Sequence, residues 1–432
     1  MRPRPLALAL LMAAPVFAAE LTGYADLQAA LDAQPGKVLT LPAGDHRISR
    51  KLVLRGDGAG LVGPGRIIQE NPDEPVLEID GLRDVILRDV TLTRAPGKTV
   101  ARKSALLAIR CAYLRIDQVR ILDNQSPTGA LALRECRFAR VTGCLIRNYM
   151  RVSVDDRTHS PDWGYAFNCT DGTGIQVTAS QGTLLEGNTV VEDIYRPTEA
   201  LKQAHQLGAW TKKNPHKGNL VSQSAWDGGY TDSWQQGSGI LVTSPEASDL
   251  TRILGNHIEN AAQGIDLHAD HVIVAHNVIV NSFMGMKAMH GSRNVLITGN
   301  QFVKNALWAI GLMPGAAAHP GQPDKPETAN ADGGSVISAN IISDFGHGDA
   351  HWIWGDERSP FKFDTGQQPD DPPLTDVVIQ GNLLHCVGPP RYRYAVIIAG
   401  PVDGPKTPRG LRFQGNSLAP GKDGVANRKL PE

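Results

Sequence analysis

One short phrase recurs along almost the whole chain, and this repeat restricts the possible folds more than any other feature. Its letters alternate between apolar and polar and end in a polar turn, as in TRILGNHIEN, VIVAHNVIVN and VLITGNQFVKN. The steps from Asn256 to Asn277 and from Asn277 to Asn300 are 21 and 23 residues, so each is one repeat, and longer steps contain insertions. The same repeat position falls at Val90, Val119, Cys144, Asn188, Asn256, Asn277, Asn300, Asn340, Asn382 and Asn416.

Short alternating strands that recur every ~20–30 residues predict a parallel β-solenoid rather than a sandwich. An α-solenoid would need paired amphipathic helices, which the pattern does not contain. We expect stacked Val, Ile and Leu to form the core and the repeated Asn to form an amide ladder between coils. From about Val38 to Leu418 the chain resembles the right-handed parallel β-helix proteins of the pectate-lyase-like superfamily. The resemblance implies an all-β, single-stranded, right-handed parallel β-helix.

The ends of the chain carry different signals. Residues 1–18, MRPRPLALALLMAAPVFA, have the pattern of a signal peptide with cleavage near Ala18 or Ala19. A short amphipathic helix from about Ala25 to Asp32 is expected to cap the first coil. We therefore divide the chain into the signal peptide, one β-helix domain over 19–418 with insertions at about 195–236 and 314–334, and a C-terminal tail over 419–432.

Composition limits the partners and the compartment. The net charge of −1 gives no indication of nucleic-acid binding, and no other apolar run is long enough to span a membrane. We expect an exported monomer, periplasmic or secreted. Among the five cysteines, Cys111 and Cys136 occupy the same position of consecutive coils, so they are either a disulfide or two buried thiols.

The candidate chemistry lies in repeats that open with Gly: GIQVT, GILVT, GIDLH and GMKAM, followed by AIGLM. Side chains alternate along a strand, so the first and third residues after Gly point into the core and the second and fourth point outward. Outward positions on adjacent coils then place Asp266 beside Lys287, with His268 further along the strand and Gln176 two coils earlier. His290, Asp270 and Arg293 lie just beyond the strand ends.

An acid, an imidazole and a cation on one surface suit proton abstraction at C5 of a uronic acid, next to its carboxylate. His268 would be the base, Lys287 would neutralise the carboxylate or donate a proton, and Asp266 would orient either one. Gln176, His290 and Arg293 would bind substrate. Four aromatic residues of the first insertion would form a wall: Trp210, Trp226, Tyr230 and Trp234.

GIDLHAD resembles the Asp-Pro-His segment of mannuronan C5-epimerases, with Leu267 in place of Pro, and GMKAMHGSRN resembles the basic coil of β-helix alginate lyases. This resemblance implies that Asp266 lies near the uronate carboxylate and that His268 transfers a proton. The expected function is an exported lyase or C5-epimerase for an acidic polysaccharide.

Other interpretations remain open at this point. Asp266 and Lys287 could form an ordinary surface ion pair. A β-helix glycoside hydrolase would use clustered carboxylates, for which Asp155, Asp156 and Asp171 are the candidates. A non-catalytic protein could bind glycans through the aromatic insertion. No cofactor is required, although calcium could bind Asp266 and Asp270.

Overall fold

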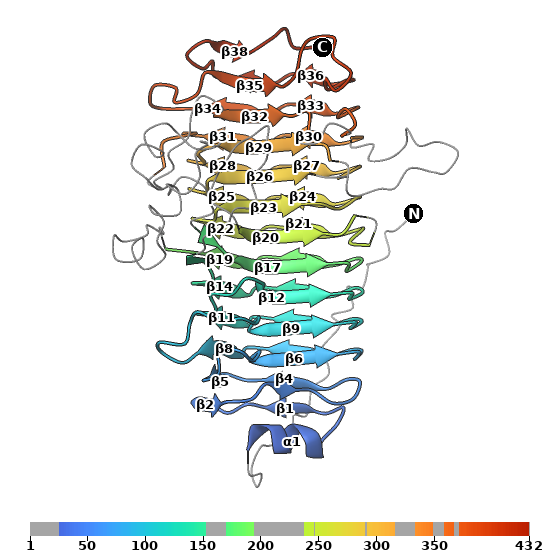
Figure 1. Cartoon of the computed structure of the whole chain (residues 1–432), viewed down its shortest axis with the longest axis vertical. Coiled ribbons are helices and arrows are strands. Elements are labelled where there is room, and N and C mark those ends of the chain that lie inside the picture. The colour runs from blue at the N-terminus through green and yellow to red at the C-terminus, as the bar shows by residue number, and fades with distance from the viewer. Residues whose placement is uncertain are drawn as a thin grey trace, which may run out of the picture.

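The computed structural model describes residues 26–152, 170–193, 237–245, 247–289, 292–315, 333–348, 358–366 and 371–431. Within these ranges the chain winds into a long solenoid whose wall consists of three parallel sheets (Figure 1). Each coil contributes one strand to each sheet, so every strand pairs with its counterparts in the coils before and after it. The predicted all-β parallel solenoid is confirmed.

The strands are arranged as follows. The first sheet contains β1 (Val38–Thr40), β4 (Gly60–Val62), β7 (Ile86–Arg88), β10 (Arg115–Asp117), β13 (Arg140–Thr142), β18 (Leu184–Glu186), β21 (Arg252–Leu254), β24 (Ile273–Ala275), β27 (Leu296–Thr298), β30 (Val336–Ser338), β33 (Val378–Gln380) and β36 (Arg412–Gln414). The second contains β2 (Asp45–Ile48), β5 (Arg66–Gln69), β8 (Thr91–Arg94), β11 (Arg120–Leu122), β14 (Leu145–Arg147), β19 (Thr189–Val191), β22 (His257–Glu259), β25 (Val278–Val280), β28 (Gln301–Val303), β31 (Ile341–Ser343), β34 (Leu383–His385) and β37 (Ser417–Leu418). The third contains β3 (Leu52–Val53), β6 (Leu77–Asp80), β9 (Leu106–Ile109), β12 (Gly129–Arg134), β17 (Thr173–Thr178), β20 (Ser238–Thr243), β23 (Gln263–Leu267), β26 (Met284–Met289), β29 (Trp308–Met313), β32 (Ser359–Phe363), β35 (Tyr394–Ile398) and β38 (Gly424–Ala426). A short antiparallel pair, β15 (Arg151–Val152) and β16 (Thr170–Asp171), lies outside these sheets.

Apolar side chains at the predicted inward positions fill the solenoid. Ile175, Ile240, Ile265 and Met286 stack in register on successive strands of the third sheet and are fully buried. The glycine that opens these strands is needed for close approach between coils. A Cβ on Gly264 would lie 2.4 Å from the carbonyl oxygen of Gly285, which is too close for any side chain.

The predicted asparagine ladder is present between the first and second sheets. Asn277 donates from Nδ2 to Oδ1 of Asn300 at 2.9 Å, and its own Oδ1 accepts from the backbone N–H and the Nδ2 of Asn256. The same contacts join the Asn residues at 188, 256, 277, 300, 340, 382 and 416. At its N-terminal end the ladder caps the backbone N–H of Cys144, which confirms that Cys144 occupies the same repeat position.

The N-terminal end of the solenoid is covered by helix α1 (Leu27–Ala33), close to the expected range (Figure 1). Asp26 caps the helix by accepting from the backbone N–H of Ala29, and Leu31 is buried. Gln28 joins helix to coil by exchanging two hydrogen bonds with the backbone of Val53. At the other end, β38 pairs with β35, so strand pairing continues beyond Leu418 into the segment that the sequence suggested as a tail.

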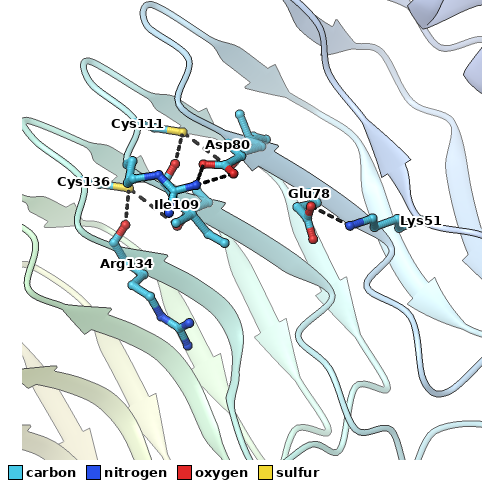
Figure 2. Close-up of polar contacts among 10 residues, drawn as sticks. Lys51, Glu78, Asp80, Ile109, Cys111, Arg134 and Cys136 are labelled. Carbon is cyan, nitrogen blue, oxygen red and sulfur yellow. Dashed lines mark hydrogen bonds and ion pairs between the residues drawn. The ribbon is translucent and has the colours of Figure 1, made fainter.

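Figure 2 shows the two cysteines of the consecutive N-terminal coils. Cys111 and Cys136 are buried free thiols. Of the two alternatives that the sequence left open, the structure therefore has the pair of thiols and not the disulfide. The Sγ of Cys111 donates to the carbonyl of Ile109 at 3.3 Å, and that of Cys136 donates to the carbonyl of Arg134 at 3.4 Å. Burial raises the pKa of the nearby Cys144 thiol to about 12.

Several sequence-based expectations fall outside the described residues. The predicted signal peptide, residues 1–18, and the predicted insertion 195–236 lie entirely outside them, and so does most of the second insertion, 314–334. Within the described ranges, no helix is long and apolar enough to cross a membrane.

Candidate active site

Strand register in the third sheet places the candidate residues in one column on its outer face. Asp266 pairs with Lys287 across β23 and β26, and both alternate with inward apolar residues. Following the register through the sheet gives the members of this Asp266 column: Gln176, Leu241, Asp266, Lys287, Gly311 and Lys362. The order expected from the sequence, up to Gly311, is confirmed.

Asp266 joins the other two predicted catalytic side chains. Its Oδ1 lies 2.9 Å from Nε2 of His268, and its Oδ2 lies 3.4 Å from Nζ of Lys287. Contrary to the expectation of a surface group, Asp266 and Lys287 are only 7% and 8% exposed. A pair that is removed from water to this extent is not an ordinary surface ion pair, and the side chain of His268 is the most exposed of the three, at 20%.

The charges of the two neighbours determine the ionisation of Asp266. Burial by itself would raise the pKa of this carboxyl, but the ammonium of Lys287 and the imidazole of His268 outweigh burial and hold the pKa at about 2. Asp266 is therefore a permanent carboxylate near neutral pH. It is suited to orienting His268 and Lys287 and not to exchanging a proton itself.

Lys362 is a further member of the column that the sequence analysis missed. It lies on β32, two coils beyond Lys287, and is buried. Its Nζ is 3.8 Å from Oδ2 of Asp364, a long ion pair with no closer carboxylate among the described residues. The available signal was the single Lys in the apolar run SPFKF, at an outward position of the strand.

An apolar cluster separate from the main core lies beside the two lysines. Its described members are Phe283, Met284, Ala306, Leu307, Trp308 and Met313. A Cβ on Gly311 would be 2.5 Å from Cε3 of Trp308, so the indole occupies the space that Gly311 leaves between Lys287 and Lys362. This apolar surface lowers the local dielectric and strengthens electrostatic interactions at the column.

Two predicted substrate-binding residues are engaged elsewhere. Gln176 accepts from the backbone N–H of Gly129 at 2.8 Å and donates to Thr178, two coils from Asp266. Arg293 donates to Oδ2 of Asp270 from Nε and Nη2, and its backbone N–H donates to Oδ1 of the same carboxylate. The charge of Arg293 is thus neutralised by Asp270 in a clamp between two turns.

The two carboxylates that were considered as calcium ligands each have a cationic partner. Both oxygens of Asp270 are occupied by Arg293, and Asp266 is paired with an imidazole and an ammonium. Among the described residues, no group of three or more His, Cys, Asp or Glu side chains could hold a metal ion.

The remaining candidates are placed as follows. His290 and the aromatic residues Trp210, Trp226, Tyr230 and Trp234 lie outside the described residues, as do Asp155 and Asp156. Asp171, from the hydrolase interpretation, forms an ion pair with Arg151 at 3.0 Å.

The architecture agrees with that of several solved structures. The catalytic unit of a thermostable GH87 α-1,3-glucanase from Streptomyces thermodiastaticus strain HF3-3 aligns with a TM-score of 0.53 and 13% identity, over 93% of this chain and 69% of the other. The A-module of the Azotobacter vinelandii mannuronan C-5 epimerase AlgE6 aligns with a TM-score of 0.52 and 12% identity, over 94% of both chains. The chain is a right-handed parallel β-helix.

A third β-helix with the same fold is a mutant tailspike protein of E. coli bacteriophage HK620, in complex with a pentasaccharide. It aligns with a TM-score of 0.50 and 13% identity, over 93% of this chain and 60% of the tailspike. No protein-family model and no curated protein sequence matches the chain. At these identities the three structures establish the fold of this β-helix and leave its reaction to be argued from the Asp266 column.

Proposed function

We propose that this β-helix is an enzyme that acts on a uronate-containing polysaccharide by removing the proton at C5, as a lyase or a C5-epimerase. The observation that carries the proposal is the contact of one buried carboxylate, Asp266, with both an imidazole and an ammonium. C5 of a uronic acid is acidified by the adjacent carboxylate, so the reaction needs a base, a group that neutralises the carboxylate, and a fixed geometry.

His268 is the proposed base. When its Nε2 carries the proton that faces Asp266, the lone pair of the neutral ring is on Nδ1, which is then the basic atom. The negative charge of Asp266 next to Nε2 stabilises the imidazolium that forms when the proton is taken up. The exposure of His268 is consistent with contact to a ligand in solution.

Lys287 and Lys362 are the proposed cations for the uronate carboxylate. Both lie on the same outer face beside apolar side chains, where an ammonium stabilises developing negative charge more strongly than it would in water. Asp266 partly neutralises Lys287, while Lys362 has a more distant acid in Asp364. With His268 neutral, the two ammonium groups and the two carboxylates balance, and Lys362 is the cation whose acid lies farther away.

Spacing argues against hydrolysis by the described residues. Glycosidases need two carboxyl groups about 5–9.5 Å apart across the bond to be cut. On the outer face, Asp266 and Asp364 are separated by three coils, or about 14 Å along the axis. This separation favours proton abstraction over hydrolysis at the column.

The test is incubation with a panel of uronate polysaccharides while the absorbance of an unsaturated product is followed. Where no absorbance develops, exchange of the C5 proton with deuterated solvent tests epimerisation. His268→Ala is expected to abolish the reaction. His257→Ala is the matched control, because His257 also contacts a carboxylate two residues away, that of Glu259 at 3.2 Å, but on the second sheet and exposed to solvent. Equal loss of activity in both variants, or turnover that survives His268→Ala, would contradict the proposed base. A protein that binds these polymers without product or exchange would be a glycan-binding protein.

A further inference from the structure

Two exposed aromatic rings form a stack at the turn between the third and first sheets. Tyr113 lies between β9 and β10, and Phe138 lies at the same position of the next coil, between β12 and β13. Their ring centroids are 5.6 Å apart with planes 14° apart, and the residues are 42% and 41% exposed. Contact between the rings therefore leaves a large part of each in solvent.

The backbone at this turn does not favour aromatic residues. Tyr113 and Phe138 have φ of 58° and 55°, in the left-handed region that bulky side chains rarely adopt. Other coils place smaller or turn-favouring residues here, mostly Gly, Asp, Asn and His: Gly58, Asp84, Gly182, Leu250, His271, Asn294, Gly334, Asp376 and Gly410. Most coils thus form this turn without an aromatic residue. The two rings are therefore not needed to form the turn.

Four arginines lie at this turn or within two residues of the rings along the chain. The guanidinium of Arg83 lies 5.2 Å from the centroid of Tyr113, and that of Arg137 lies 5.8 Å from the centroid of Phe138. Arg115 and Arg140, two residues beyond the rings, are exposed and directly opposite one another in register, which is unfavourable for like charges. Among the described residues, none of the four has a carboxylate partner, unlike the nearby Arg110 and Arg147.

We propose that Tyr113, Phe138 and these four arginines form a binding surface for an anionic polysaccharide, three to four coils from Asp266. Stacking on a ring holds a guanidinium in place while its N–H groups remain available for a carboxylate or sulfate. The exposed ring edges provide an apolar strip for the C–H surface of a sugar. The inference rests on this surface alone and does not require the reaction proposed for His268.

The test is binding of a polyuronate, measured by affinity electrophoresis and calorimetry at low salt, with neutral dextran as the comparison polymer. Tyr113→Asn/Phe138→Asn introduces a residue that the same turn accepts at Asn294. We expect binding to weaken by about tenfold or more, while the thermal unfolding midpoint stays the same or rises by about 1–2 °C because backbone strain is relieved. Leu250→Asn is the matched control, because Leu250 is 51% exposed at φ 62° in the same turn position but has no ring, and it should keep wild-type binding.

Arg83→Gln/Arg137→Gln should weaken binding and reduce its salt dependence. Binding is scored as the difference between the Asn double variant and Leu250→Asn, which share an unaltered Asp266 column, so the result does not depend on turnover. Unchanged binding of the Asn double variant would overturn the proposal, as would equal binding of dextran or loss of binding in Leu250→Asn. A fall of several degrees in the unfolding midpoint of the Asn double variant would show instead that the rings are structural.

Discussion

Lys287 stands directly opposite Asp266 in the parallel register of β23 and β26, and its Nζ lies 3.4 Å from Oδ2 of that carboxylate. Both residues are buried on the outer face of the sheet, where either charge alone would be poorly solvated. The pair is therefore interdependent, and loss of one partner should cost more than loss of both.

Removing the carboxylate tests this dependence. Asp266→Asn leaves the ammonium of Lys287 buried without its counter-charge and should reduce the free energy of unfolding by about 3–5 kcal/mol. Asp364→Asn is the control, because Asp364 lies 3.8 Å from Lys362 and is more exposed, so its loss should be much smaller. Urea unfolding of Asp266→Asn, of Lys287→Met and of the double variant Asp266→Asn/Lys287→Met measures the coupling between the two charges. The double variant should be more stable than Asp266→Asn alone. Additive losses would show that the two charges do not interact.

The pH dependence of stability has a defined window for Asp266. Its pKa is about 2 in the folded state against 3.8 as the ordinary value, so the folded state favours the carboxylate. The stabilisation is complete above about pH 4 and is lost as the pH falls towards 2, amounting to about 2 kcal/mol. When the pH is lowered from 5 to 2, the free energy of unfolding of the wild type should therefore fall by about 2 kcal/mol more than that of Asp266→Asn. Parallel pH profiles for the two proteins would contradict the lowered pKa.

Lys362 provides a test of the column beyond the predicted residues. Replacing it with Met preserves length and removes the charge, so we expect kcat on a uronate polymer to fall by about tenfold or more if the ammonium stabilises the reacting carboxylate. Lys51→Met is the control, since Lys51 forms a surface pair with Glu78 at 2.7 Å near the N-terminal end of the solenoid (Figure 2). Steady-state kinetics of both variants decide the matter, and equal activity of Lys362→Met and wild type would remove Lys362 from the site.

The parallel fold and the column were accessible from sequence because both follow from short-range periodicity. Alternation in GIDLH and GMKAM assigns Ile265 and Met286 to the core and Asp266 and Lys287 to the outer face, and equal repeat lengths put the latter two side by side. The distance between Asp266 and His268 was beyond such reasoning, because it depends on side-chain rotamers. The burial of Asp266 and Lys287 could not be predicted either, since periodicity gives the direction of a side chain and not what surrounds it.

Lys362 and Arg293 illustrate the same limit. The long step from Asn340 to Asn382 obscures the repeat register, so the strand SPFKF was not aligned with the others. Arg293 was expected to meet substrate because it follows a strand, but Asp270 lies one coil earlier at hydrogen-bonding distance and holds it. Sequence spacing cannot exclude such a partner in a neighbouring turn.

The asparagine ladder should make a position-dependent contribution to stability. Asn277→Ala removes an amide that joins Asn256 to Asn300 in the interior, and each buried group left unpaired should cost about 1–3 kcal/mol. Asn416→Ala is the control at the C-terminal end of the ladder, where the amide is partly buried and water can replace its contacts. Denaturant unfolding should show a clearly lower midpoint for Asn277→Ala than for Asn416→Ala. Equal midpoints would mean that the interior amides contribute no more than the partly buried amide at the end of the ladder.

Glu192 should give the opposite pH dependence to Asp266. Burial raises the pKa of this carboxyl from 4.5 to about 7, although its Oε2 accepts from the backbone N–H groups of Tyr149 and Met150, both at 2.8 Å. Between these two pKa values the folded state binds more protons than the unfolded state, so stability falls as the pH rises. The wild type should therefore lose about 3 kcal/mol of unfolding free energy between pH 5 and pH 8. Glu192→Gln keeps an acceptor for the two N–H groups without the titration and should lack this loss, whereas the exposed Glu186→Gln should retain it. Urea titrations of the three proteins at both pH values measure the difference, and a wild-type slope in Glu192→Gln would assign the pH dependence to another group.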